Sequence, residues 1–382
     1  MPQLKPGQEY ETIINRFDGG IVNDPRDPAE NTARIISNFD ILTSPRKMTP
    51  YRASESGDDA GSTSTKRNFA IALRTGTTYS LYALGVVSGT GRAEILFKNL
   101  TTGSATDLDD NAWATPSNNQ SSTGATEFDL FIFYPRTGLI YGARAGTNIW
   151  TFSPSGAAFA DSHQALTYAN IGQGIVHSKD DFLYIPYYNA GGFIARNNNG
   201  VWTNAALTLP VGLNPVSICE FGNYLAIGCA DIGGWGNARI FLWDRDSSLT
   251  TLNESIDGQT GDLRILNEVD GELISISAKG IVAATGSFRD RVIFRVLVGN
   301  RMVKFLELQA DNTPGSPTAQ VGIQKQKIDN RLLFQMLIEL NGAVRDGVWS
   351  IGRVGPGVPF SLAHERTSNN NTALATGDGV RG

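Results

Sequence analysis

Apolar runs of strand length recur along the chain, each bounded by residues that favour turns. Five stretches begin with a turn and continue as an apolar strand: TGTTYSLYAL from Thr75, KDDFLYIPYY from Lys179, FGNYLAIGCA from Phe221, VDGELISISA from Val269 and IDNRLLFQML from Ile328. EFDLFIFYPR from Glu127 fits this pattern more loosely. Helical periodicity is nearly absent, and its best candidate is the segment Pro28 to Phe39. The pattern predicts an all-β protein.

An aromatic residue follows each of these turns, 19 to 21 residues on in five cases and 35 residues on in one, on what we expect to be the third strand of a small sheet. The six aromatic residues are Phe97, Trp150, Trp202, Trp243, Phe305 and Trp349. They are 41 to 62 residues apart, close to the repeat length of a propeller blade. A small sheet cannot bury both faces alone, so a large aromatic residue at one register would fill the space between neighbouring sheets. The sequence predicts a β-propeller-like ring of about six or seven four-stranded blades. The alternative is a sandwich with ordinary hairpins.

The two ends of the chain differ from its middle. Residues 54–66 and 101–126 are polar and poor in apolar residues, as is the segment after His364. We therefore predict an N-terminal arm and linker over 1–66, the propeller over 67–363 and a polar C-terminal tail over 364–382. One way to close the ring is a seventh sheet that combines strands from 34–52 with the last strand near 358–363.

The two cysteines test the predicted register of one hairpin. Gly222-Asn223 is a two-residue turn signal, which places Phe221 opposite Tyr224 and Cys219 opposite Ala226. Side chains alternate along strands, so Cys219 and Cys229 lie on opposite faces. We expect Cys229 opposite Val216 and no disulfide between the two cysteines.

Composition narrows the classes of function. The net charge of -5 over 382 residues is too small to predict tight electrostatic binding to DNA or to an anionic membrane. No segment has the length and apolarity of a membrane-spanning helix, and the N-terminus lacks the pattern of a signal peptide. We expect a soluble protein that is made in a cytoplasm.

The sequence contains no recognisable catalytic or metal-binding motif. It has no CxxC pair, only three widely separated histidines, and neither GxSxG nor HExxH. The acidic pairs Asp180-Asp181 and Asp244-Asp246 lack the spacing of a glycosidase dyad, and acids at turns usually serve turn geometry. We predict a protein that is not an enzyme, with no cofactor and no metal.

Two further features suggest binding surfaces. Residues 288–304 are locally basic, and the side chains that could contact DNA or a partner are Arg289, Arg291, Arg295, Arg301 and Lys304. The alternative is an ordinary solvated edge. Trp235 lies between glycines, which would leave its ring exposed for stacking on a sugar. A carbohydrate-binding propeller, of the adhesin or lectin type, is therefore an alternative function, and a glycan hydrolase is a less favoured one.

The segment 17–52, FDGGIVNDPRDPAENTARIISNFDILTSPRKMTPYR, resembles the opening of the tail nozzle, or tail tubular, proteins of short-tailed bacteriophages. Those proteins begin with a Gly-Gly-Ile/Leu element, a proline-bearing stretch, an Asn and then an Arg before a strand. The matching positions are Gly19, Gly20, Ile21, Pro25, Pro28, Asn38 and Arg46. The Gly-Leu that precedes the Arg in the family is replaced by Thr43-Ser44-Pro45, and the resemblance covers about a tenth of the chain.

This resemblance implies a structural protein of a virion, made in the host cytoplasm. Its propeller would be one of several copies around the path by which DNA leaves the particle. Its partners would be copies of itself and other virion proteins, with transient, non-specific contact with genomic DNA. The arm would contact neighbouring subunits through Gly19, Gly20, Ile21, Asn38 and Arg46.

Overall fold

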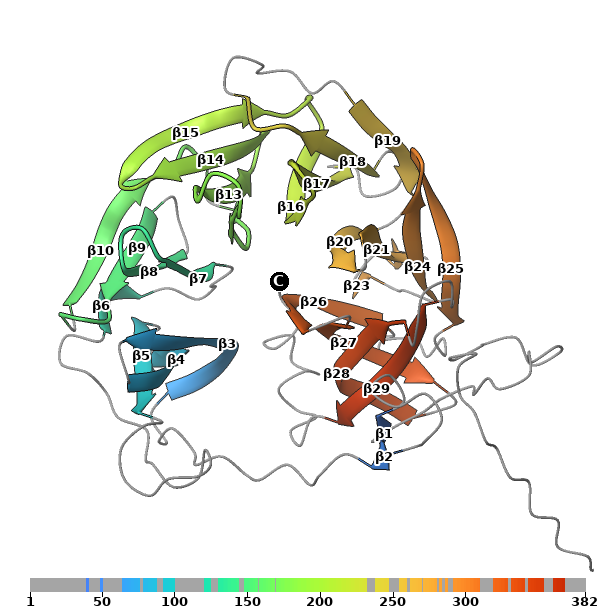
Figure 1. Cartoon of the computed structure of the whole chain (residues 1–382), viewed down its shortest axis with the longest axis horizontal. Helices are drawn as coiled ribbons and strands as arrows, with labels where there is room; N and C mark the ends of the chain where they lie inside the picture. Colours follow the sequence, from blue (N-terminus) through green and yellow to red (C-terminus); the bar gives the residue numbers. More distant parts are fainter. Residues whose placement is uncertain are drawn as a thin grey trace, which may run out of the picture.

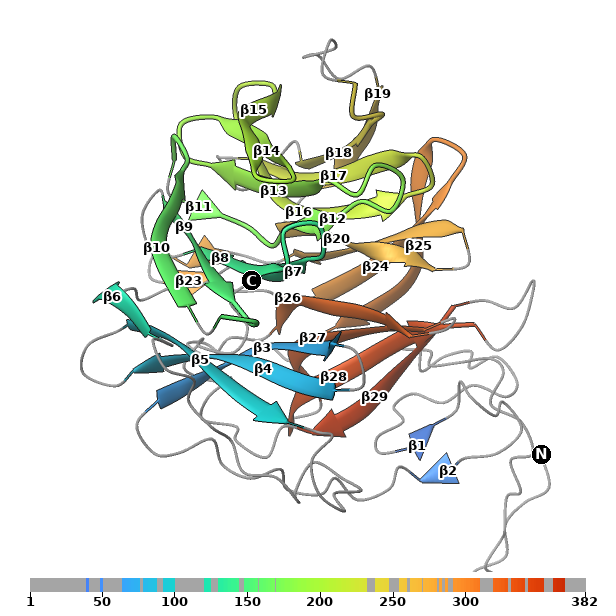
Figure 2. The same cartoon turned by 60° about the vertical axis from the view of Figure 1, so that its left-hand side comes forward.

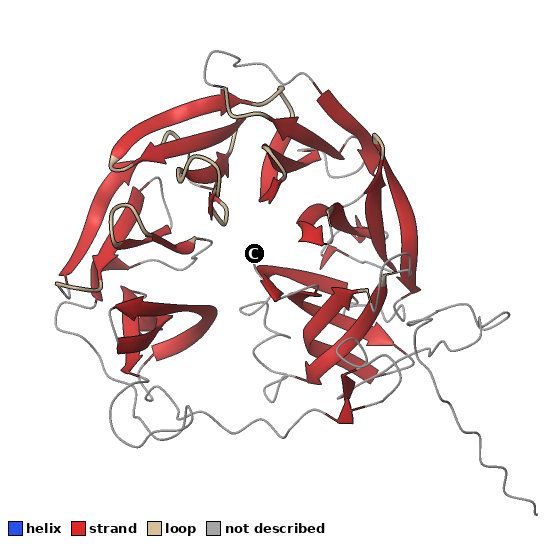
Figure 3. Cartoon of the chain, in the orientation of Figure 1, coloured by secondary structure: helices blue, strands red, loops and turns tan. Residues whose placement is uncertain are grey.

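The computed structural model describes the chain in segments. These are residues 39–40, 49–50, 64–75, 78–87, 92–99, 120–124, 130–143, 148–156, 158–168, 170–231, 238–246, 254–259, 262–269, 271–279, 282–283, 286–287, 291–309, 319–328, 331–340, 343–353 and 360–367. Within these segments the secondary structure consists of strands and turns (Figure 3). The strands form a ring of small antiparallel sheets (Figure 1).

The first three sheets are built from consecutive strands. The first contains β3 (Ser64–Thr75), β4 (Thr78–Val87), β5 (Arg92–Asn99) and β6 (Gln120–Gly124). The second contains β7 (Phe131–Tyr134), β8 (Leu139–Ala143), β9 (Asn148–Ser153) and β10 (Ala158–Ala165). The third contains β11 (Asn170–Ile171), β12 (Ile175–Val176), β13 (Leu183–Tyr188), β14 (Gly192–Asn198) and β15 (Val201–Thr208). Because β11 and β12 both pair with β13, they act together as one interrupted inner strand.

The next three sheets follow the same plan. The fourth contains β16 (Leu213–Phe221), β17 (Tyr224–Asp231), β18 (Ala238–Trp243) and β19 (Glu254–Gln259). The fifth contains β20 (Asp262–Val269), β21 (Glu272–Lys279), β24 (Arg291–Val298) and β25 (Arg301–Gln309). A small hairpin of β22 (Val282–Ala283) and β23 (Gly286–Ser287) lies between β21 and β24 in the chain. The sixth contains β26 (Ala319–Ile328), β27 (Arg331–Leu340), β28 (Ala343–Gly352) and β29 (Ser361–Thr367).

In each sheet the first strand in the chain lies nearest the centre of the ring and the last lies at the outside, as Figures 1 and 2 show. This arrangement is a β-propeller, so the predicted fold class is confirmed, with six blades in the described part of the chain. Among the described residues, the strands that we considered for a seventh sheet pair differently. β29 pairs with β28 as the outer strand of the sixth sheet, while β1 (Phe39–Asp40) and β2 (Thr49–Pro50) pair with each other. β1 lies beside β29. The strands of the ring run from Ser64 to Thr367, slightly beyond the predicted 67–363.

Apolar side chains fill the spaces between neighbouring sheets. The first and second sheets share a cluster that includes Tyr82, Trp150 and Phe152. A second cluster joins the second and third sheets, a third joins the third and fourth, and a fourth joins the fourth and fifth. Phe294 and Phe334 connect the fifth and sixth sheets with ring centroids 6.0 Å apart. The core of the molecule is therefore a series of junctions around the ring.

The six aromatic residues take two kinds of position. Phe97, Trp150, Trp243 and Trp349 lie on third strands, as predicted. Trp150, Trp243 and Trp349 are at most 2% exposed. Trp202 and Phe305 lie instead on the fourth strands β15 and β25. The physical reason is that tight turns at Asn199-Gly200 and at Gly299 end the third strands before these residues, with positive φ angles of 49°, 92° and 64°.

The cysteine hairpin has the predicted register near its turn. Phe221 pairs with Tyr224 and Cys219 with Ala226. Cys219 and Cys229 are buried and form no disulfide, and they lie in separate clusters on opposite faces of the fourth sheet. An irregularity between Pro215 and Ser217 shifts the pairing, so Cys229 lies opposite Pro215 and not Val216.

Candidate functional site

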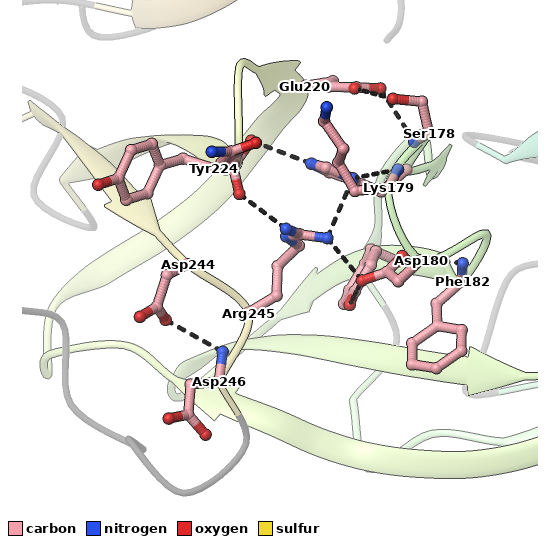
Figure 4. A network of polar contacts seen from close by, with 12 residues as sticks. Ser178, Lys179, Asp180, Phe182, Glu220, Tyr224, Asp244, Arg245 and Asp246 are labelled. Atoms are coloured by element: carbon pink, nitrogen blue, oxygen red, sulfur yellow. Dashed lines mark hydrogen bonds and ion pairs between the residues drawn. The ribbon is translucent and has the colours of Figure 1, made fainter.

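A cluster of polar side chains lies at one end of the junction between the third and fourth sheets (Figure 4). Antiparallel strands alternate in direction, so the loops after the first and third strands of a sheet lie at the same end. We call this end of the ring the turn face. The cluster joins the β12–β13 loop, residues 177–182, to the β16–β17 turn and to the residues after β18.

Arg245 lies at the centre of this cluster. It follows β18 in a loop with a positive φ of 71°, and its side chain is 12% exposed. Its Nη1 donates to Asp180 Oδ2 at 2.7 Å and to His177 Nδ1 at 3.1 Å. Its Nη2 donates to the Asn223 carbonyl at 2.8 Å. The guanidinium thereby connects the fourth sheet to the loop of the third.

Asp180 uses both carboxylate oxygens. Oδ1 accepts a hydrogen bond from the Phe182 backbone N–H at 3.0 Å, which fixes the turn. Oδ2 accepts from the Tyr184 hydroxyl at 2.8 Å as well as from Arg245. Burial, followed by the hydrogen bond to Asp180, raises the pKa of Tyr184 well above its ordinary value. Tyr184 therefore remains a neutral donor to the carboxylate.

His177 is fully buried beneath this ion pair. Its Nδ1 accepts from the Lys179 backbone N–H at 3.2 Å and from Arg245. Its Nε2 is 3.3 Å from the Tyr224 carbonyl oxygen, which can only accept. These partners assign the ring proton to Nε2. The imidazole is thus held as a connector between the two sheets.

Glu220 adds a second contact across the same junction. It lies on β16 and accepts from the Ser178 backbone N–H at 3.1 Å and from the Ser178 hydroxyl. Glu268 occupies the equivalent place on β20, one residue before the closing pair of the turn, and accepts from the Gly222 backbone N–H at 3.3 Å. Acids near the ends of two inner strands therefore bind the preceding sheet.

The arginine contact is repeated as well. Arg353 follows β28, the third strand of the sixth sheet, and forms an ion pair with Glu272 of the fifth sheet. Arg245 follows the third strand of the fourth sheet and binds Asp180 of the third. The sequence analysis missed both arginines. The available signal was an Arg placed one or two residues after the third strand, in FLWDRD and in WSIGR.

The chemistry of the cluster is that of a structural connection. Asp180 and Asp244 each accept from the backbone N–H two residues ahead, as predicted for acids at turns. Asp180 is further occupied by Arg245 and Tyr184, whose donors take up its oxygens. No group of three potential metal-ligating side chains occurs among the described residues. No helix of the described segments is long and apolar enough to cross a membrane.

The predicted basic residues are only partly free to bind a partner. Arg295 lies opposite Lys304 across β24 and β25, and Lys304 forms an exposed ion pair with Glu307 at 2.8 Å. Burial lowers the pKa of Arg295, and the nearby Glu307 opposes this shift. Arg301 is exposed at the start of β25, and the backbone of Arg291 lies on β24. Arg289 lies outside the described residues.

The remaining predicted sites are in undescribed segments. The arm residues Gly19, Gly20, Ile21, Asn38 and Arg46 lie outside the described residues, as does Trp235.

Comparison with known proteins adds only similarity of fold. No family model and no curated protein sequence matches the chain. The β-propeller domain of Myceliophteria thermophila Cps50 (Swd1) is 10% identical with a TM-score of 0.45, over 78% of this chain and 90% of that one. The WD40 β-propeller of Doa1 is 12% identical with a TM-score of 0.42, over 71% and 80%. The catalytic domain of the Coprinopsis cinerea GH62 α-L-arabinofuranosidase is 10% identical with a TM-score of 0.33, over 80% and 92%.

Proposed function

We propose that this chain is a non-enzymatic β-propeller that serves as a structural component of a bacteriophage tail. The observation that supports a scaffold is the use of charged side chains at the turn face. Arg245, Asp180, Glu220 and Arg353 are engaged in contacts between neighbouring sheets, which rigidify the ring. A ring whose neighbouring sheets are joined by such contacts suits a building block of an assembly.

The N-terminal segment supports the placement in a tail. Its Gly-Gly-Ile element and the following proline, Asn and Arg resemble the opening of tail nozzle proteins. In this proposal the propeller is made in the host cytoplasm, joins copies of itself through the arm, and becomes part of the virion near the path of the DNA. Interfaces of this kind need specific side-chain complementarity and no catalytic group.

Light scattering with electron cryomicroscopy of the purified chain tests the proposal. We expect a closed ring of several propellers, and loss of that ring when residues 1–66 are removed. The truncated chain serves as its own control, because retained β-type circular dichroism and cooperative melting would show that the propeller still folds. A full-length chain that stays monomeric, at concentrations where virion proteins assemble, would contradict the proposal. Saturable binding on a glycan array would then favour the carbohydrate-binding alternative.

A further inference from the structure

Two arginines on the turn face share one aromatic ring. Arg136, in the β7–β8 loop of the second sheet, places its guanidinium carbon 5.5 Å from the ring centroid of Phe182. Arg196, on β14 of the third sheet, places its guanidinium carbon 5.7 Å from the same centroid. Stacking on an aromatic ring orients a guanidinium and leaves its N–H groups available at the edges. The ring of Phe182 thus has two guanidinium groups within 6 Å of its centroid, one from the second sheet and one from the third.

These two arginines lack the carboxylate partners that Arg245 and Arg353 have. Arg136 is exposed and donates to the side-chain oxygen of Asn198 at 2.9 Å, which is a neutral partner. Neither Arg136 nor Arg196 forms an ion pair with a described residue, and none of their nitrogens is among the buried unpaired atoms of the described segments. Those of their N–H groups that make no hydrogen bond to a described residue are therefore not fully buried.

We propose that Arg136 and Arg196 form a binding site for a phosphate group on the turn face. The planar guanidinium presents paired donors that match the oxygens of a phosphate, and two such groups around one ring can approach it together. The phosphate is either part of a nucleic-acid backbone or a free anion. For a nucleic acid the site rests on the proposed function, because it supplies the non-specific DNA contact of a tail protein. We therefore place the contact with DNA on the turn face and not on residues 288–304.

The acids of the same loop determine how strong the site is. Asp180 is paired with Arg245, and Figure 4 shows Asp180 between Arg245 and Phe182. Asp181 is exposed, directly precedes Phe182 and has a positive φ of 56°. Its charge opposes anion binding, and an asparagine adopts this backbone conformation readily. Replacing Asp181 with Asn should therefore strengthen phosphate binding without disturbing the turn.

The test measures binding of two probes to the full chain. The first probe is a short fluorescent oligothymidylate, followed by anisotropy over a range of salt concentrations, and the second is inorganic pyrophosphate, followed by calorimetry. The variants are Arg136→Gln, Arg196→Gln, the double variant and Asp181→Asn. Lys304→Gln is the matched control, because it removes one exposed positive charge from the outer strand of the fifth sheet. Thermal melting of each variant confirms that it folds.

We expect each arginine variant to weaken binding about tenfold and to reduce the slope of log affinity against log salt by about one for the oligonucleotide. Asp181→Asn should tighten binding, and Lys304→Gln should leave it within about twofold. Binding of pyrophosphate alone would identify a site for free phosphate, and binding of both probes would identify a backbone site. Unchanged affinity in the folded double variant, or an absence of saturable binding to either probe, would overturn the proposal. Assembly of the chain into a ring is measured separately, so this site can fail while the proposed tail function stands.

Discussion

Between the first and second sheets the contact consists of aromatic and aliphatic side chains, whereas at the junction of the third and fourth sheets a charged cluster adjoins an apolar one. Trp150, Phe152 and Tyr82 fill the first junction, with the rings of Tyr82 and Phe152 6.3 Å apart. At the junction of the third and fourth sheets, the rings of Tyr184 and Trp243 meet edge to face with centroids 5.8 Å apart. This apolar contact lies next to the ion pair of Arg245 and Asp180.

The difference separates two tasks at the junctions of a propeller. Apolar burial stabilises contact between sheets but depends little on direction. Hydrogen bonds and ion pairs depend on geometry, so Arg245 can bind Asp180 only when the two sheets meet at one height and angle. We infer that aromatic packing supplies most of the stability, and that the charged cluster fixes the relative position of neighbouring sheets.

The largest expected effect is that of Trp150→Ala. Trp150 is fully buried, and its indole lies across Gly142, where even a Cβ atom would collide with the ring. Removing the indole leaves a cavity, so the free energy of unfolding should fall by about 3 to 5 kcal/mol. Equilibrium urea denaturation followed by circular dichroism measures this loss. Trp202→Ala, on an outer strand, is the matched control and should cost clearly less; equal losses would contradict the importance of the first junction.

The next effect is that of Asp180→Asn at the charged junction. The substitution keeps an acceptor for the Phe182 N–H but leaves the guanidinium of Arg245 without a carboxylate, at a site where Arg245 is 12% exposed. We expect a loss of about 2 kcal/mol in the free energy of unfolding. Asp244→Asn is the control, since Asp244 is exposed and, among the described residues, accepts from the Asp246 N–H alone. A double variant that also carries Arg245→Met should lose less than the sum of the single losses.

A smaller effect is expected for Ser178→Ala. Its hydroxyl donates to Glu220 across the third junction, and this contact is exposed to solvent. The free energy of unfolding should fall by about 0.5 to 1 kcal/mol, because the Ser178 backbone N–H still binds the carboxylate. Added salt should reduce the difference between variant and parent. A loss as large as that of Asp180→Asn would show that the contact of Glu220 contributes as much to the free energy of unfolding as the ion pair of Arg245.

The buried tyrosines should make the free energy of unfolding depend on pH only in alkali. Burial raises the pKa of Tyr82 in the first junction and of Tyr184 in the third from an ordinary value of 10.0. Well below pH 10 the folded chain and the unfolded chain both keep these phenol protons, so the two tyrosines contribute no pH dependence to the free energy of unfolding. Above it the unfolded chain releases protons that the folded chain retains, and stability falls as pH rises. Urea denaturation between neutral and alkaline pH measures the fall, which Tyr184→Phe should reduce; an unchanged slope would argue against it.

Local sequence carried enough information to predict the blades and the faces of one hairpin. The turn at Gly222-Asn223 sets the strand register, and the register places Cys219 and Cys229 on opposite faces of the sheet. The turn and the alternation of side chains are both local properties of the sequence. Asn199-Gly200 carries the same kind of signal and marks the turn that places Trp202 on a fourth strand. The nearly constant spacing of the aromatic residues predicted a third strand for Trp202, whereas this turn places it on the fourth. The shift of Cys229 to Pro215 arises from an irregularity within a strand, which has no comparable sequence signal.

The polar cluster could not be predicted in the same way. Arg245 and Asp180 are 65 residues apart in the chain, and they meet only because the third and fourth sheets pack side by side. Arginines and acids are common at turns, so neither residue identifies its partner without the arrangement of the sheets. The same holds for Arg136 and Arg196, which come from different sheets and meet at Phe182.

Each of the six described sheets is assembled from strands that follow one another in the chain, and none combines strands from its two ends. A blade therefore has all its strands as soon as its outer strand has been synthesised, and contacts with low sequence separation form quickly. Folding can then proceed by adding blades in order from the N-terminal side during translation. Any contact between the first and the sixth blade can form only after the sixth blade is complete, because the strands of that blade come last in the chain.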